Sequence, residues 1–286
     1  MELDLQKGYT AESDADTVVY TAIFDSYDTL IDPLICEEGA DYICFTDDSE
    51  LRSDIWDIVE VDSDSSVNPA RLNRYLKLHP HKILPDYEYS IYIDGNIQIV
   101  SELVENCHTY LDNYSIAAHH HSTNNNVREE AESVVRYHLA PPDQVYRQLG
   151  RYFVEGFPDK QELTTNRVLY RKHNSSSCVE LMSEWWSELS RETHRDQLSL
   201  NYILWRENTD IRVIQKPVWG SEMFEIHPHN PTDWRRYIWD YWMNIRVDRR
   251  ENSLYTAIFY FIQALRIGFI EGIDTLYYRI RRKLSQ

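Results

Sequence analysis

A strand-like apolar run over residues 88–93 stops abruptly at Asp94-Gly95-Asn96, and residues 17–24 and 41–46 repeat this design, each run being followed by an aspartate. Short runs rich in β-branched and aromatic residues predict buried strands. In an open α/β sheet, ligands bind beyond the carboxyl ends of the strands, so a carboxylate placed there points into the binding cleft. The runs therefore predict one sheet with a shared functional edge, and Asp94 is its first candidate residue.

Helix signals alternate with the strand-like runs. Asn68-Pro69 offers an N-cap amide followed by proline at the first helical position, and it predicts a helix over residues 69–78. A shorter strand is predicted at 55–61, and the remaining helices and strands alternate downstream. Helices are expected at 100–111, 128–138, 141–153, around 180–186 and after Arg195-Asp196, and strands at 114–118, 167–171 and 211–214. This alternation predicts an α/β fold with a mostly parallel sheet flanked by helices.

Charge and composition narrow the function classes. The 286 residues carry 47 acidic and 29 basic side chains and a formal net charge of -18, which argues against nucleic acid as a partner. Because only 7 of the basic residues are lysine, salt adaptation is a hypothesis. The four cysteines are too widely spaced for a zinc knuckle or a redox pair, and the N-terminus shows no secretory signal. We expect a cytoplasmic protein.

The C-terminal part differs in character from the rest. Residues 232–286 hold 10 basic and 6 acidic residues, and their apolar run over 254–273 is interrupted by Gln263, Arg266 and Glu271. An interrupted run followed by a basic cluster is typical of a helix that lies on an anionic membrane surface rather than one that crosses it. The alternative is a helical hairpin packed on protein. We therefore expect a flexible N-terminus (1–16), an α/β domain (17–231) and a helical tail (232–286).

Two sets of polar residues are candidates for binding a divalent cation and the phosphate groups of a substrate. Asp94 and Asn96 offer oxygen ligands for Mg²⁺ or Mn²⁺ around a glycine that lets the backbone turn, although the same residues form ordinary turns. Arg71, Arg74 and Lys77 recur every third residue of a predicted helix, and guanidinium groups engage phosphate oxygens in a bidentate manner. The alternative for these three is a solvated helix face.

Further candidates lie downstream. Asp196 stands at an apparent helix start, where an N-cap role is the common alternative to a functional one. His227 and His229 flank a proline, and imidazoles beside carboxylates suit Mn²⁺ or Zn²⁺, although loop histidines are more often ordinary surface residues.

The order of the motifs carries a resemblance. Six spaced motifs resemble, in their order, a glycosyltransferase-like family that includes plant mucilage-polysaccharide proteins, and the resemblance covers residues 17–230. The motifs lie at residues 20–28, 44–47, 69–71, 92–97, 155–158 and 185–199. The resemblance implies a GT-A-like fold that binds a nucleotide-sugar donor with Mn²⁺ or Mg²⁺. It further implies transfer to a glycan or lipid-linked acceptor. From the N-terminal sequence and the basic tail, we expect a cytoplasmic location that includes the inner face of the membrane.

The resemblance also implies roles for individual residues. Asp94 and Asn96 take the place of the family's metal-binding pair, with asparagine replacing the second aspartate, and His227 or His229 completes that metal site. Asp196-Gln197 is similar to the Asp-Gln pair held near the donor sugar. Phe24 and Tyr27 then face the nucleobase, and Arg71, Arg74 and Lys77 face the diphosphate.

Two other classes of function are compatible with the same residues. A metal-dependent hydrolase of a lipid or phosphate ester would use the same carboxylates and histidines, and it would form product from water without a nucleotide sugar. A non-catalytic protein would bind the nucleotide sugar without turning it over.

Overall fold

A computed structural model describes residues 14–61, 67–158, 162–227 and 252–270, together with residues 229, 242, 245 and 249. The chain forms two compact units, Met1–Thr232 and Asp233–Gln286, each of which is described by itself. Most of the predicted flexible N-terminus and most of the predicted tail lie outside the described residues.

Seven strands of the first unit form one sheet in the order β3-β2-β1-β4-β7-β6-β8. Neighbouring strands from β3 to β4 run parallel, as do β6 and β8, whereas β7 runs antiparallel to both β4 and β6. This confirms the predicted α/β fold with a mostly parallel sheet. The strands are β1 (Thr17–Ile23), β2 (Ala40–Thr46), β3 (Asp57–Glu60), β4 (Tyr89–Ile93), β6 (Ile116–His120), β7 (Thr164–Arg171) and β8 (Arg212–Ile214).

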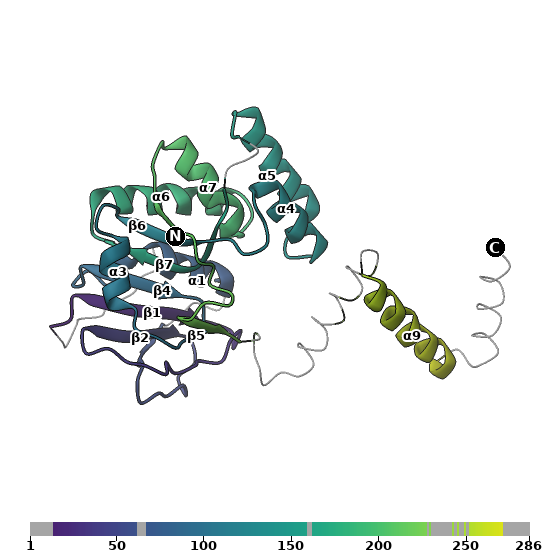
Figure 1. The fold of residues 1–286 in the computed structure, drawn as a ribbon, viewed down its shortest axis with the longest axis horizontal. Coiled ribbons are helices and arrows are strands. Elements are labelled where there is room, and N and C mark those ends of the chain that lie inside the picture. Colours follow the sequence, from purple (N-terminus) through teal and green to yellow (C-terminus); the bar gives the residue numbers. More distant parts are fainter. Residues whose placement is uncertain are drawn as a thin grey trace. The chain divides into compact units, whose positions relative to one another are not determined.

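Side chains from the two faces of the sheet enter two separate hydrophobic clusters, as the alternation along β1 shows. Val18 and Tyr20 pack with the helices α1, α4, α5, α6 and α7, whereas Val19 and Ile23 pack with α3 and the small antiparallel pair β5–β9 (Figure 1). The helices on the first face are α1 (Pro69–Leu78), α4 (Val127–Arg136), α5 (Pro142–Val154), α6 (Ser176–Arg191) and α7 (Asp196–Arg206), and a short α2 (Pro80–Ile83) follows α1. The other face carries α3 (Val104–Tyr110), β5 (Ile97–Ile99) and β9 (Phe224–Ile226).

Local signals position α1 as predicted. The Asn68 side chain accepts hydrogen bonds from the backbone N–H groups of Ala70 and Arg71, which are two of the donors that a helix start leaves without a partner. The predicted helix over 100–111 is shorter than expected and begins at Val104. The N–H of Val100 donates to the carbonyl of Met223 at 3.0 Å, which continues the pairing of β5 with β9 beyond residue 99.

The second unit contains the helix α9 (Ser253–Ile270), which overlaps most of the apolar run noted in the sequence. No helix in the described part of the chain is long and apolar enough to span a bilayer.

Candidate active site

A cavity of about 580 Å³ opens at the edge of the sheet where β1, β4 and β6 end. Its wall comes from the loop after β1, the helix α1, the turn after β4, the first residues of β7, and parts of α4 and α7. Because β7 runs antiparallel to its neighbours, its amino end reaches the same edge as their carboxyl ends. The cavity therefore lies where the sequence predicts the functional edge.

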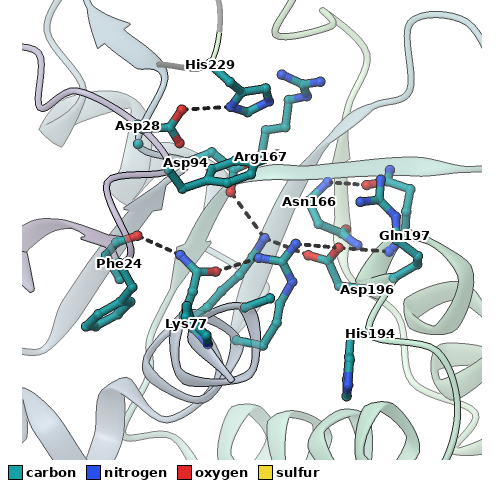
Figure 2. Close-up of a pocket in the computed structure, with 18 of the residues that line it drawn as sticks. Phe24, Asp28, Lys77, Asp94, Asn166, Arg167, His194, Asp196, Gln197 and His229 are labelled. Atoms are coloured by element: carbon teal, nitrogen blue, oxygen red, sulfur yellow. Dashed lines mark hydrogen bonds and ion pairs between the residues drawn. The ribbon is translucent and has the colours of Figure 1, made fainter. Parts of the chain in front are cut away.

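A buried ion pair joins α1 to the start of α7 inside this cavity. Lys77 Nζ, on a side chain that is 1% exposed, lies 2.7 Å from Asp196 Oδ2 and 3.6 Å from Asp94 Oδ1. Arg74 Nη2 lies 3.6 Å from the other Asp196 oxygen. Figure 2 shows Lys77, Asp94 and Asp196 drawn together from separate elements. Two of the three predicted basic residues therefore meet two predicted carboxylates.

The surroundings of Asp196 keep its carboxylate charged. Burial alone would raise its pKa, but the charges of Arg74 and Lys77 hold the pKa well below its usual range. Burial acts against the charge of Arg74 as well, yet Asp196 raises the pKa of this guanidinium above its ordinary value. The residue at the N-cap of α7 is Arg195, without a side-chain cap bond, so Asp196 is not the N-cap.

Gln197 fixes the start of α7 to the first residues of β7. Its amide nitrogen donates a short hydrogen bond to the carbonyl of Thr164, and its Oε1 accepts a 3.4 Å bond from the backbone N–H of Asn166. Gln197 lines the cavity and, through these bonds, holds Asp196 beside β7.

The turn after β4 presents Asp94 to the cavity. The N–H of Ile97 donates to the carbonyl of Asp94 at 3.0 Å, which closes the turn between β4 and β5. A Cβ on Gly95 would lie 2.8 Å from Ile23 Cγ1 and 3.0 Å from Asp28 Oδ2, so only glycine fits there without a shift of its neighbours. The close approach holds the turn against the loop after β1.

Of the other predicted metal ligands, His229 lines the cavity, whereas Asn96 and His227 do not. Asn96 does not line the cavity, and its amide donates to the carbonyl of His227 at 2.7 Å while its Oδ1 is buried without a partner. His227 turns its Nε2 toward Gln98 Oε1 at 3.0 Å. His229 does line the cavity, with its Nδ1 2.7 Å from Asp28 Oδ1 (Figure 2).

The predicted ligands do not form a complete metal site as they lie. No group of three or more His, Cys, Asp or Glu side chains is placed to hold a metal ion within the ranges that the structure describes. Asp94 faces a lysine, and the carbonyl oxygen of Asn96's amide does not reach the cavity. The divalent cation stays a prediction.

The loop after β1 is held in an unusual backbone conformation beside the cavity. Asp25 and Ser26 have φ values of 55° and 49°, in the left-handed region that side chains rarely adopt. Asp47, at the end of β2, fixes this loop by accepting the N–H of Asp25 at 3.1 Å. Phe24 and Tyr27 on either side both line the cavity, and Tyr27 is 45% exposed.

Arg71 does not reach the cavity, which corrects the prediction that the three basic residues share one face. Its guanidinium carbon lies 5.6 Å from the ring centre of Trp186. A helix turns by about 100° per residue, so each step of three residues drifts by about 60° around the axis. Arg71 and Lys77 are therefore directed to different sides of α1.

Some charged residues of the cavity were not predicted from the sequence as functional candidates, among them Arg167, Arg195 and Glu130. Arg167, near the start of β7, and Arg195, before α7, add two cations, while His121 and Glu130 add a second ionisable pair. Arg195 was visible beside Asp196 in the sequence. A lone arginine in a strand gives no signal of its own.

Comparison with known proteins agrees with the resemblance seen in the motifs. The TOD1/MUCI70, glycosyltransferase-like domain, matches residues 3–229. "Probable hexosyltransferase MUCI70" of Arabidopsis thaliana is 26% identical over 238 residues, which cover 72% of this chain and 39% of that protein. The chain thus spans about two fifths of the length of this curated relative.

A solved structure of the bifunctional glycosyltransferase WbbM, in its apo form, is similar with a TM-score of 0.48 and 14% identity, over 74% of this chain and 40% of that one. A likeness at this level adds nothing to the assignment. The family match, in contrast, covers most of the chain. The chain therefore belongs to the TOD1/MUCI70 glycosyltransferase-like domain family, as the motifs predicted.

Proposed function

We propose that this domain transfers a hexosyl group from a nucleotide-sugar donor to a hydroxyl group of a glycan or lipid-linked acceptor. Family membership and the hexosyltransferase name of the plant relative support the class of reaction. The observation that carries the proposal is the cavity in which Arg74 and Lys77 lie against Asp94 and Asp196 at the carboxyl edge of the sheet.

Cations of the chain itself would stabilise the leaving group. When the bond between the sugar and the diphosphate breaks, negative charge develops on the diphosphate oxygens, and fixed positive charges there lower the barrier. Arg167 and Arg195 line the cavity and form no ion pair with another described residue, so their guanidinium groups are available to phosphate. Arg74 and Lys77 extend the positive wall, although Asp196 balances part of their charge.

Asp196 orients the donor sugar in this scheme and does not act as the base. A carboxylate that is held ionised by two cations is a weak proton acceptor but accepts hydrogen bonds from sugar hydroxyl groups well. Gln197 keeps it in place. Phe24 and Tyr27 would hold the nucleobase at the exposed end of the cavity.

Mn²⁺ or Mg²⁺ at Asp94 is a further part of the proposal and follows from the family resemblance. Hard oxygen donors suit both ions, and a bound ion would add positive charge beside the diphosphate. His229 and Asp28 line the same cavity as Asp94, and their imidazole and carboxylate groups are of the kinds that could complete such a site.

Binding of donors tests the proposal first. We would screen uridine and guanosine diphosphate hexoses by thermal shift, with and without Mn²⁺, since a ligand of the native state raises its apparent stability. We expect one donor to raise the melting temperature and Asp94→Ala to lose this shift. The matched control is Asp86→Ala, which removes an exposed carboxylate before β4.

Release of nucleoside diphosphate then separates the three classes of function. Release that depends on a sugar acceptor supports transfer. Binding of the donor without any release would identify a non-catalytic protein, whereas no binding, combined with metal-dependent cleavage of a lipid or phosphate ester by water, would identify a hydrolase.

For the tail we propose docking on the inner face of an anionic membrane, where a lipid-linked acceptor would lie. The α9 helix exposes Leu254, Tyr260 and Phe261, and four basic residues occur at positions 279–283 of the sequence. Full-length protein should co-sediment with vesicles that contain phosphatidylserine and not with neutral vesicles at moderate salt. Equal recovery with both would reject the docking.

A further inference from the structure

A second ionisable pair lines the same cavity and has no part in the donor scheme. His121 follows β6, and Glu130 lies in α4 with 6% of its surface exposed. His121 Nε2 lies 3.8 Å from Glu130 Oε2, and Asn124 donates its amide N–H to the same oxygen at 2.7 Å. The pair and Asn124 thus form one cluster on the cavity wall.

Hydrogen bonds of His121 fix which nitrogen carries its proton. Its Nδ1 accepts the backbone N–H of Asn124 at 2.9 Å, so this nitrogen carries no proton. The neutral ring then has its proton on Nε2, the nitrogen that faces Glu130. Burial lowers the pKa of His121 to about 4, so the ring is neutral at physiological pH. Because Nδ1 accepts a hydrogen bond and Nε2 carries the proton, the neutral ring has no free nitrogen to accept a proton, so His121 positions Glu130 and is not itself a base.

Glu130 keeps one carboxylate oxygen available. Asn124 engages Oε2, whereas Oε1 has no hydrogen-bond partner among the described residues. Burial raises the pKa of Glu130, partly offset by the Asn124 hydrogen bond and the charge of Arg195. Asp196, in the same cavity, is shifted in the opposite direction. Two carboxyl groups whose surroundings move their pKa values apart are suited to different roles, and Glu130 is the stronger proton acceptor.

We propose that Glu130 is the general base that activates the acceptor hydroxyl, with His121 and Asn124 as its positioning residues. This inference rests on the proposed glycosyl transfer. In the step, the acceptor oxygen forms a bond to the anomeric carbon while its proton passes to Glu130. The bond from that carbon to the phosphate oxygen breaks, and its electron pair leaves with the nucleoside diphosphate. A single displacement of this kind inverts the anomeric configuration.

The test compares Glu130→Gln with Glu132→Gln. Both remove one negative charge from α4, but Glu132 is exposed and lies outside the cavity. The assay measures release of nucleoside diphosphate from uridine and guanosine diphosphate hexoses, offered with an array of neutral mono- and disaccharides. Thermal shift with the same donors measures binding.

We expect Glu130→Gln to bind the donor with an affinity within about twofold of the unaltered protein. Its kcat should fall by about 10²- to 10⁴-fold, which is the usual contribution of a general base. Glu132→Gln should keep both. The pH profile adds a readout that a structural role would not move, because a base must lose its proton to act. In the unaltered protein, kcat should fall on the acid side as Glu130 is protonated in the field of His121, Arg167, Arg195 and Asp196.

Several results would overturn the inference. Transfer by Glu130→Gln at nearly the unaltered rate, or a product that retains the anomeric configuration, would reject Glu130 as the base and leave the glycosyltransferase proposal standing. Absence of binding by any donor to the unaltered protein would reject both proposals. If Glu130→Gln does not fold, Glu130→Asp decides, because it keeps a carboxylate. An acid-side loss of kcat in that variant supports the inference, and a kcat independent of pH contradicts it.

Discussion

The buried pair of Lys77 and Asp196 makes a quantitative prediction about stability. Both side chains are nearly excluded from solvent, at 1% and 7% exposure, and their charged atoms lie 2.7 Å apart. Lys77→Met would leave Asp196 buried with Arg74 at 3.6 Å as its remaining ion-pair partner. Asp196→Asn would leave Lys77 with Asp94 at 3.6 Å. Each change thus removes the nearest partner of a buried charge and leaves that charge with one opposite charge at 3.6 Å.

The magnitude follows from the distances. At an effective dielectric constant of about 20, unit charges attract by about 6 kcal/mol at the separation of Lys77 and Asp196, and by about 5 kcal/mol at that of Lys77 and Asp94. Removal of the charges from water offsets most of this attraction, and loss of one partner of a buried pair costs about 3–5 kcal/mol. Because a second partner remains in both variants, we expect each to lose about 3 kcal/mol of unfolding free energy.

Urea unfolding, followed by tryptophan fluorescence at neutral pH, measures these losses. The double variant should lose no more than about 4 kcal/mol, which gives a coupling energy of about 2 kcal/mol between the two residues. Lys82→Met, at an exposed position on α2, is the control and should change stability by less than about 0.5 kcal/mol. Losses below about 1 kcal/mol in the single variants, or losses that simply add in the double variant, would refute the reasoning.

Three further predictions concern packing, pH and salt. Gly95→Ala should lose about 1–3 kcal/mol in urea unfolding, because its Cβ would lie 2.8 Å from Ile23 Cγ1, whereas Gly150→Ala, in a helix with open space around it, should lose nothing. Burial lowers the pKa of His79 and His173 to about 4. Protons therefore bind the unfolded chain first, and stability should fall as the pH drops from 6.5 toward 4, by up to about 3 kcal/mol for each histidine. Urea midpoints that stay constant over this window would contradict the assignment. Molar KCl should raise the melting temperature by screening the net charge of -18, and an unchanged melting curve would remove the hypothesis of salt adaptation.

Local sequence signals predicted the elements that position the site. Asn68-Pro69 marks the start of α1 because an amide cap and a fixed proline φ act within a few residues of the chain. The strands β5 and β9 were missed because each has three residues and is defined by pairing between positions 97–99 and 224–226. Pairing over such a distance leaves no local pattern.

The sequence identified several residues of the site but not the contacts between them. Lys77 and Asp196 were both candidates, but their contact joins positions 119 residues apart. Arg71 was grouped with Lys77 because a spacing of three residues resembles a helix face, although over two such steps the drift around the axis reaches about 120°. Glu130 is one of three glutamates in α4, and its burial depends on tertiary packing, since α4 contacts both α5 and α7.

The antiparallel strand β7 determines which side chains reach the functional edge of the sheet, and the proposed transfer depends on them. Its amino end lies beside the carboxyl ends of β4 and β6, and the carbonyl of Arg167 accepts the N–H of Asp94 at 2.9 Å. A parallel strand in this position would bring Arg171 to the edge instead, and Arg171 is used in the core, where it donates to the carbonyl of Lys77. The reversal therefore brings Arg167 to the edge that also holds Asp94 and Lys77. In the proposed scheme these groups bind the donor, and Glu130, with His121 and Asn124, receives the acceptor in the same cavity.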